Sequence, residues 1–249
     1  MQIPEYIEKF VVRYSEVDMY NSLKIRSVFD YLQQVAAAHA NLLGCGLNNM
    51  HSDQKIWVLQ RMSLELFKKI KADDVLTVRT YPSGRERLFF RREFEVTDEA
   101  GERVLIGSSY WLVIDGATLR PVRNFTFELP IDESKDKFCD YNADLRLTAE
   151  EIEKIKDNYT EFKVNYSSVD VNLHLNNANY PMLVQDSLYE KIGREFEFKS
   201  FQISFNIARK LNENIKVNSI INDDRTFKAA GLNDEGKVIF ESAGTLDWN

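Results

Sequence analysis

The sequence has few of the residues that build metal and disulfide sites. Its 249 residues include two cysteines, Cys45 and Cys139, and three histidines, His39, His51 and His174. No CxxC, HxxxH or HExxH spacing occurs among them, which argues against a zinc site and against a disulfide framework. We therefore expect two plain thiols in a reducing compartment, no metal and no cofactor.

Positive charge and long apolar runs are also scarce. The 32 Lys and Arg stand against 39 Asp and Glu, and the formal net charge of −7 excludes broad electrostatic attraction to nucleic acid. No apolar run reaches the roughly 18 residues that a membrane span needs, and the acidic start MQIPEYIEKF is unlike a signal peptide. The hydrophobic fraction of 44% is that of a folded protein with a core. We expect a cytoplasmic protein without a membrane span.

An internal repeat organises the chain. Val12 and Asp18 recur as Val164 and Asp170, and the Tyr, Ser and Val between them recur at the same offset of 152 residues. Each copy leads into a helical pattern, over 28–43 and 180–188, and then into strand-like runs. The runs lie at 56–67, 75–82, 87–98 and 103–115 in the first half, and at 201–208, 215–222, 225–232 and 237–248 in the second.

The segment between the copies is richer in Pro, Asp and Lys. It contains the amphipathic run TAEEIEKIKD, in which Thr148 and Glu151 have the spacing of a capping box. The sequence therefore predicts an α+β protein of two units, residues 1–125 and 159–249, joined by a linker with one short helix at 126–158.

The two copies differ where the shared motif ends. Asn172 and His174 in the second copy stand where the first copy has Tyr20 and Ser22. If 169–175 is extended, its valines and leucines lie on one face, and Asp170, Asn172 and His174 lie on the other. A carboxylate can orient an imidazole, an imidazole can act as general base, and an amide can hold a carbonyl or a water. The free N–H groups of a helix entry at 176–180 can stabilise an oxyanion.

A structural interpretation of the same residues stays open. Asn-rich segments often form turns and helix N-caps, and a polar histidine in a turn is commonly solvated. The presence of the amide and imidazole in only one copy favours the catalytic interpretation. His39, on the apolar face of a helix beside three alanines, is interpreted as a core histidine, and His51 as an exposed loop residue.

The chain resembles the acyl-acyl-carrier-protein thioesterases of the bacterial and plant fatty-acyl type. The resemblance covers nearly the whole chain, and its specificity comes from several motifs in one order. They are VRYSEVDMYNSLKIRSVFDYLQQVAAAHA at 12–40, WVLQRM at 57–62, TYPSGRERLFFRREFEV at 80–96, WLVIDGATLRPVR at 111–123 and YSSVDVNLHLNNANY at 166–180.

The resemblance implies two tandem hotdog domains, each with a long helix wrapped by an antiparallel sheet, and hydrolysis of fatty acyl thioesters to free fatty acid and carrier protein. The family's D-x-N-x-H signature falls on Asp170, Asn172 and His174. Plant members carry a further Glu on the strand after the second helix, and the pattern places Ala208 there; Glu213 is not assigned in its place. We therefore expect His174 to be the base for water attack. No GxSxG elbow occurs, in keeping with hydrolysis without a covalent serine.

The resemblance also implies an acyl tunnel in the first half and an acyl carrier protein as partner. The expected tunnel residues are Phe29, Leu32, Val35, Trp57 and Met62, although each alone is more typical of an ordinary core. An acidic carrier needs a local basic patch on this acidic chain. Candidates for the patch are Arg85, Arg87, Arg91 and Arg92, or Lys68, Lys69 and Lys71.

Three alternatives share the fold. One is a thioesterase acting on acyl-coenzyme A, another is a non-catalytic module that binds acyl thioesters, and a third, less favoured by the motifs, is a dehydratase. The two units of one chain can pair with each other, so both a monomer and a homodimer are compatible with the sequence.

Overall fold

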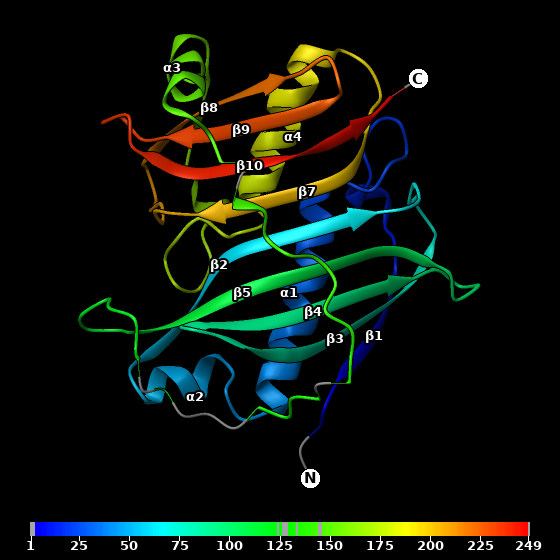
Figure 1. The fold of residues 1–249 in the computed structure, drawn as a ribbon, viewed down its shortest axis with the longest axis vertical. Coiled ribbons are helices and arrows are strands. Elements are labelled where there is room, and N and C mark those ends of the chain that lie inside the picture. Colours follow the sequence, from blue (N-terminus) through cyan, green and yellow to red (C-terminus); the bar gives the residue numbers. More distant parts are fainter. Residues whose placement is uncertain (1–2, 124, 126–128, 133, 144–145, 249) are drawn as a thin grey trace.

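The structure is a computed structural model that describes residues 3–123, 125, 129–132, 134–143 and 146–248 (Figure 1). The repeat is visible as two similar units, each with one long helix and five strands. The first contains β1 (Tyr6–Val11), α1 (Ile25–Leu42), α2 (Leu47–Ser52), β2 (Lys55–Leu66), β3 (Val75–Glu86), β4 (Phe89–Thr97) and β5 (Arg103–Asp115). The linker contains α3 (Ala149–Asp157), and the second unit contains β6 (Thr160–Lys163), α4 (Asn179–Ile192), β7 (Glu197–Phe205), β8 (Asn214–Ile221), β9 (Thr226–Leu232) and β10 (Val238–Asp247).

All ten strands of the described residues form one antiparallel sheet. Its order is β1-β3-β4-β5-β2-β7-β10-β9-β8-β6, so the second half repeats the first in mirrored order about the β2–β7 seam. At that seam Arg61 pairs with Ser204 and Glu65 with Ser200. The eight predicted strands and both long helices are confirmed, whereas β1, α2 and β6 were not predicted.

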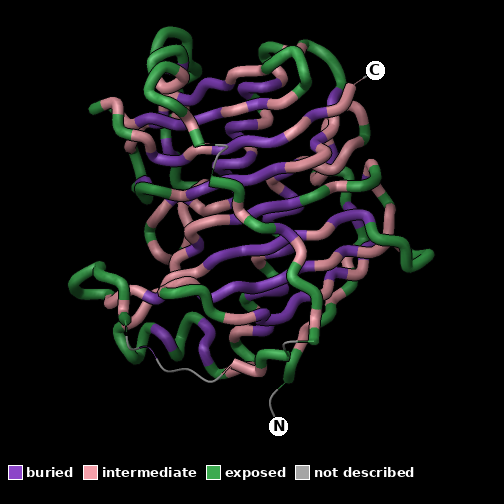
Figure 2. Tube along the Cα trace, in the orientation of Figure 1, coloured by how far each residue is buried: buried purple, intermediate pink, exposed green. Residues whose placement is uncertain are grey.

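The two long helices lie on the same face of the sheet, with α4 above α1 behind the strands in Figure 1, and they contact each other. Their contacts run in opposite directions along the two helices. Tyr20, just before α1, meets Tyr189, and the Ile25 N–H donates to Oε1 of Gln185 at 3.1 Å. Buried residues follow the strands in Figure 2, and the main core lies between helices and sheet. No helix in the described ranges is long and apolar enough to cross a bilayer.

The linker crosses the opposite face of the sheet, in front of the strands in Figure 1. The alternation of β4 points Arg91 and Glu93 toward this face, where Arg91 Nε donates to Oε1 of Glu93 at 2.7 Å. Glu93 also accepts the backbone N–H of Phe138 in the linker at 3.0 Å. The short linker helix is confirmed as α3, and the predicted capping box is present, with Glu151 N–H donating to Oγ1 of Thr148.

The two halves differ in the connection between the long helix and the next strand. After α4 the chain turns at Gly193, in the left-handed region with φ 66°, and enters β7 at once. After α1 it makes an excursion through residues 43–54 that includes α2 before β2 begins. The corresponding connection in the second half consists of residues 193–196 alone.

The helix faces differ as well. At the repeat offset, Ala36, Ala37 and Ala40 of α1 correspond to Leu188, Tyr189 and Ile192 of α4. Leu188 is fully buried in the core of the second half. Small side chains on α1 and the excursion after it together leave room in the first half that the second half fills.

Candidate active site

The segment 169–175 is a tight turn. Val169 and Leu175 form an isolated antiparallel bridge, and the Leu173 N–H donates to the Asp170 carbonyl at 3.0 Å. Leu173 has a φ of 62°, so the chain reverses at this residue. The expectation of an extended segment with one apolar buried face is therefore wrong: Val171 and Leu173 are each 74% exposed.

The Asp170 carboxylate holds this turn together. Its Oδ1 accepts the backbone N–H of Asn172 at 2.8 Å and that of His174 at 3.4 Å. Such a side-chain-to-backbone arrangement is an Asx turn, which short acidic side chains form well. Within the described residues the carboxylate makes no hydrogen bond to the His174 ring.

The first copy folds in the same way. Oδ1 of Asp18 accepts the N–H groups of Tyr20 at 2.9 Å and of Ser22 at 3.0 Å. Its Tyr20 hydroxyl, however, lies 3.1 Å from the hydroxyl of Tyr189 on α4. The shared aspartate thus builds the turn in both copies, and Asn172 of the second copy lines a cavity of the first half.

That cavity has a volume of about 390 Å³ and lies in the first half. Its walls come from the second part of α1, from α2, and from the ends of β2, β4 and β5. The turn of the second half closes one side of it. Lining residues from the first half include Ala36, Ala37, Ala40, Cys45, Met50, Trp57, Phe90 and Trp111, and those from the second half are Asp170, Val171, Asn172, Asn176 and Asn177.

Two amide groups at this wall are available to a ligand. The side-chain amide of Asn172 and the backbone N–H of Asn177 make no hydrogen bond in the part of the chain that the structure describes. Asn176, by contrast, is engaged: its Oδ1 accepts the Ala178 N–H at 2.9 Å at the entry to α4. Asn177 therefore offers a free N–H near the positive end of a helix dipole, where negative charge is stabilised.

His174 belongs to the same turn and is half-buried, but it is not among the residues that line the cavity. Its carbonyl accepts the Asp170 N–H at 2.8 Å, so its backbone is fixed. Its ring makes no hydrogen bond to any described residue. The structure thus brings Asp170 and Asn172 to the cavity wall and leaves His174 in the same turn, outside the lining.

Of the five expected tunnel residues, Trp57 lines the cavity. Its indole N–H donates to the Cys45 carbonyl at 3.0 Å, and its ring packs edge-on against Phe90. The other four are buried in the main core between helix and sheet and do not line this cavity. They are Phe29, Leu32, Val35 and Met62.

The expected docking arginines separate into two pairs. Arg85 and Arg87 are exposed, whereas Arg91 and Arg92 are only 3% and 9% exposed. Arg91 is bound by Glu93 and Asp140, and the side chain of Arg92 points inward to His39. The prediction of a four-arginine surface is corrected accordingly, because a partner on the surface cannot reach two of its members.

The alternative lysine patch is largely neutralised. Lys68 forms ion pairs with Asp98 and Glu102, and Lys69 with Glu195. Lys71 is exposed. Paired surface charges of this kind present little net positive potential to a partner.

The core interpretation of His39 agrees with the structure, whereas His51 differs partly from its interpretation as a loop residue. His39 is fully buried with hydrogen bonds at both ring nitrogens, to Arg92 and to the Ile3 carbonyl. His51 is exposed, as expected, yet it lies on α2 and also lines the cavity. Both thiols are free and buried, and burial raises the pKa of Cys45.

Ala208 is exposed and follows β7 in the connection to β8, so no carboxylate stands at this position. The nearby Glu213 has other partners: its Oε2 accepts the Lys210 N–H at 2.7 Å and lies 3.2 Å from Nε of Arg209. This connection supports the turn, because the Arg209 carbonyl accepts the Leu175 N–H at 2.7 Å.

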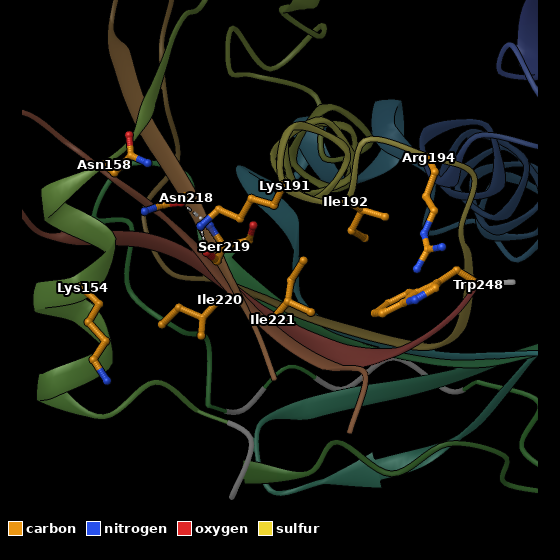
Figure 3. Close-up of a pocket in the computed structure, with 10 residues that line it drawn as sticks. All are labelled: Lys154, Asn158, Lys191, Ile192, Arg194, Asn218, Ser219, Ile220, Ile221 and Trp248. Carbon is orange, nitrogen blue, oxygen red and sulfur yellow. Dashed lines mark hydrogen bonds between the residues drawn. The ribbon is translucent and has the colours of Figure 1, made fainter. Parts of the chain in front are cut away.

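A second cavity, of about 640 Å³, opens between α3, the end of α4 and β8 (Figure 3). Its walls include Lys154, Lys191, Arg194 and Trp248. None of its lining residues is a carboxylate, a histidine or a cysteine, and Lys191 donates to the Ser219 carbonyl. None of the residues of the turn at 169–175 lines it, so the candidate active site is the cavity of the first half.

Comparison with known proteins agrees with this architecture. Two family models match the chain: acyl-ACP thioesterase N-terminal domain over residues 4–125, and acyl-ACP thioesterase C-terminal domain over residues 151–243. A solved acyl-ACP thioesterase from Bacteroides thetaiotaomicron superposes with a TM-score of 0.86 at 19% identity, covering 98% of both chains. The 12:0-ACP thioesterase from Umbellularia californica superposes with a TM-score of 0.79 at 18% identity, covering 99% of this chain and 98% of that one.

A curated relative is oleoyl-acyl carrier protein thioesterase 2, chloroplastic, of Arabidopsis thaliana, 27% identical over 220 residues. The match covers 80% of this chain but 58% of the relative, so this chain spans little more than half of that protein. The two family models together cover most of the chain, which therefore belongs to the acyl-ACP thioesterase family. The expected tandem hotdog fold is confirmed by the superposed structures.

Proposed function

We propose that this protein hydrolyses fatty acyl-acyl carrier protein thioesters to free fatty acid and carrier protein. The observation that carries the proposal is the composite cavity, in which Asp170 and Asn172 of the second half line a mostly apolar space built by the first half. A fatty acyl thioester has the same two parts, a long apolar chain and one polar reacting group. The names of the family and of the relatives support this substrate class.

The proposal divides the work between the two units. Residues 1–125 hold the acyl chain, residues 126–158 link the units, and residues 159–249 supply the reacting groups. Trp57, Phe90 and Trp111 give the chain apolar walls, and the alanines of α1 give it space. Both parts of the site lie in one chain, so a monomer already contains the complete site.

The chemistry depends on the groups at the wall. The Asn172 amide and the Asn177 N–H hold the thioester oxygen and stabilise the charge that develops on it, an effect worth about 10²-fold or more per donor. His174, in the same turn as Asn172, removes a proton from the attacking water, which contributes about 10² to 10⁴-fold. Asp170 keeps the turn that carries both residues. The thiol of the carrier's prosthetic arm leaves with the proton that histidine took up.

For the carrier protein we propose a docking surface made by Arg85 and Arg87. Arg85 stacks on the ring of Phe90, which lines the cavity, at 5.0 Å from the ring centroid. Its guanidinium also donates to the carbonyls of Arg123 and Phe125, which fixes its position. An acidic partner bound here sits next to the cavity. We place the reaction in the cytoplasm, in keeping with two free thiols.

The test measures free fatty acid released from one acyl chain presented on carrier protein and on coenzyme A. The proposal expects release from both thioesters, with a higher kcat/KM on carrier protein that falls when Arg85 and Arg87 are replaced by Ser. Equal kcat/KM on the two carriers would favour the acyl-coenzyme A alternative. Tight binding without release would identify a non-catalytic acyl-binding module.

A further inference from the structure

Arg92 is a buried cation inside the half that holds the cavity. It lies on the helix-facing side of β4, and its Nη1 donates to Nδ1 of His39 at 3.0 Å and to Oγ1 of Thr80 at 3.1 Å. Nε2 of His39 lies 2.9 Å from the Ile3 carbonyl. The ring therefore donates from Nε2 and accepts at Nδ1, which makes it the neutral tautomer. Both partners of Arg92 are neutral.

The neighbouring arginine shows what a buried guanidinium ordinarily has. Arg91, on the other side of the same strand, forms ion pairs with Glu93 and Asp140. Among the described residues Arg92 has no carboxylate partner. Burial lowers its pKa to about 10, so the guanidinium is still charged at neutral pH. A buried charge without a counter-charge is costly, and a ligand oxygen that meets it reduces that cost.

Arg92 also lines the cavity. Its Nε and Nη2 groups make no hydrogen bond to any described residue, so these donors are available to an occupant of the cavity. Much of the remaining lining is apolar, with Phe90, Trp57 and alanines. Two other cations, Arg91 and Lys55, also line the cavity, but each is paired with a carboxylate. The guanidinium is thus a polar point on a mostly apolar wall.

The position of Arg92 along the cavity is set by the two helices. Contacts between α1 and α4 run antiparallel: Ile25 meets Gln185, and Arg26 meets Met182. Going toward the start of α4 therefore corresponds to going along α1 toward its middle, and Gln33 there lines the cavity together with Asn176 and Asn177 before α4. His39 is six residues further along α1, about 9 Å by the helical rise. We therefore expect Arg92 to meet a bound acyl chain at a distance from the turn, and so away from the thioester.

We propose that Arg92 is a specificity residue that selects acyl chains carrying a hydrogen-bond-accepting oxygen, a hydroxyl or a carboxylate, away from the thioester. This inference rests on the proposed function, because it assumes that the chain occupies the cavity with its thioester at the turn. The hydroxyl or carboxylate oxygen of the chain accepts hydrogen bonds from Nε and Nη2 of Arg92, which otherwise has no carboxylate partner among the described residues. A chain with a plain alkyl end leaves those donors without a partner.

The experiment compares acyl-carrier protein substrates of equal length that end in methyl, hydroxyl or carboxylate, with KM and kcat measured for each at several lengths. At the length where the end reaches Arg92, the oxygenated chains have a KM lower by about tenfold to hundredfold, the range for a charge-assisted hydrogen bond. The hydroxyl and carboxylate arms distinguish the two oxygen sources. Failure to hydrolyse any chain would refute the proposed function, whereas equal KM values at every length would refute only the role of Arg92.

Three variants separate selection from a purely structural role. Arg92→Met removes the donors and abolishes the preference, and Arg92→Lys keeps a positive charge and restores part of it. Thr80→Val is the matched control, because it removes one Arg92 contact from outside the cavity lining and leaves the preference unchanged. Thermal unfolding of each variant shows that it is folded. A preference that survives in folded Arg92→Met contradicts the inference; if that variant does not fold, a preference unaltered in Arg92→Lys contradicts it.

Discussion

Oδ1 of Asp170 lies 2.8 Å from the backbone nitrogen of Asn172 and accepts its hydrogen bond. Asp18 makes the equivalent bond to Tyr20 at 2.9 Å in the other copy, which has neither the amide nor the imidazole. Because the same bond occurs with and without the catalytic candidates, the first role of this aspartate is to shape the turn. It positions Asn172 and His174 through the backbone.

Asp170→Asn and Asp170→Ala test that role. An asparagine Oδ1 can accept the same backbone N–H groups, so we expect Asp170→Asn to keep most of the turnover and Asp170→Ala to lose at least about tenfold. Fatty acid release at saturating substrate measures both.

The matched control is Asp18→Ala, which opens the other turn. We expect it to cost stability of about 1 kcal/mol, as for other lost side-chain-to-backbone caps, with kcat unchanged. Equal loss of turnover in Asp170→Asn and Asp170→Ala would show instead that the negative charge takes part in the reaction.

Asn172 is expected to act as a donor to the thioester oxygen. Replacing it by Asp removes the side-chain N–H groups with little change in size, and we expect kcat to fall by about 10²-fold. Leu173→Ala, at an exposed neighbour in the same turn and outside the cavity lining, is the control and should retain full activity. Wild-type kcat in Asn172→Asp would exclude this donor role.

The alanine face of α1 is expected to set the length of chain that fits. Ala40→Ile introduces the residue that the second copy carries at the equivalent position and fills part of the cavity. We expect the profile of released fatty acids to move to shorter chains while the shortest substrates keep their kcat. Ala38→Ile, on the same helix and outside the cavity lining, serves as control; a profile unmoved by Ala40→Ile would place the chain elsewhere.

The buried His39 gives a pH dependence of stability. Burial, and next the Arg92 guanidinium, lowers the pKa of His39 in the folded state below its ordinary value. The unfolded chain therefore takes up the proton first as the pH falls, and the free energy of unfolding decreases through about pH 6.5 and below. His39→Gln lacks the group that takes up this proton. Its free energy of unfolding, measured by urea denaturation, should therefore decrease less between about pH 8 and pH 5. Parallel curves for the two proteins would contradict the assignment.

The repeat and the hydrophobic patterns were sufficient to predict the two long helices and eight of the strands. They missed α2, β1 and β6, because a helix as short as Leu47–Ser52 and strands at the sheet edges carry little periodicity. The extended conformation considered for 169–175 rested on the alternation of its apolar residues, and the segment is a turn. Leu173 is in the left-handed region and Val171 is exposed, which alternation alone does not reveal.

The location of the cavity was within reach of the sequence by another route. Comparing the copies at their offset shows that Ala36, Ala37 and Ala40 replace large residues, and that the connection after the first helix is much longer. Phe29, Leu32 and Val35 were chosen for being apolar on the helix, and that property identifies the core face. The burial of Arg91 and Arg92 depends on strand pairing and on the linker, which local sequence does not specify.

We propose that the first half holds the acyl chain and that the turn of the second half hydrolyses its thioester bond. Single-turnover hydrolysis of acyl-carrier protein by His174→Ala tests this division of work most directly. We expect the variant to fold, to bind the acyl substrate as the wild type does, and to release free fatty acid at least about 10²-fold more slowly. Release at the wild-type rate by the folded variant would show that this turn does not supply the base.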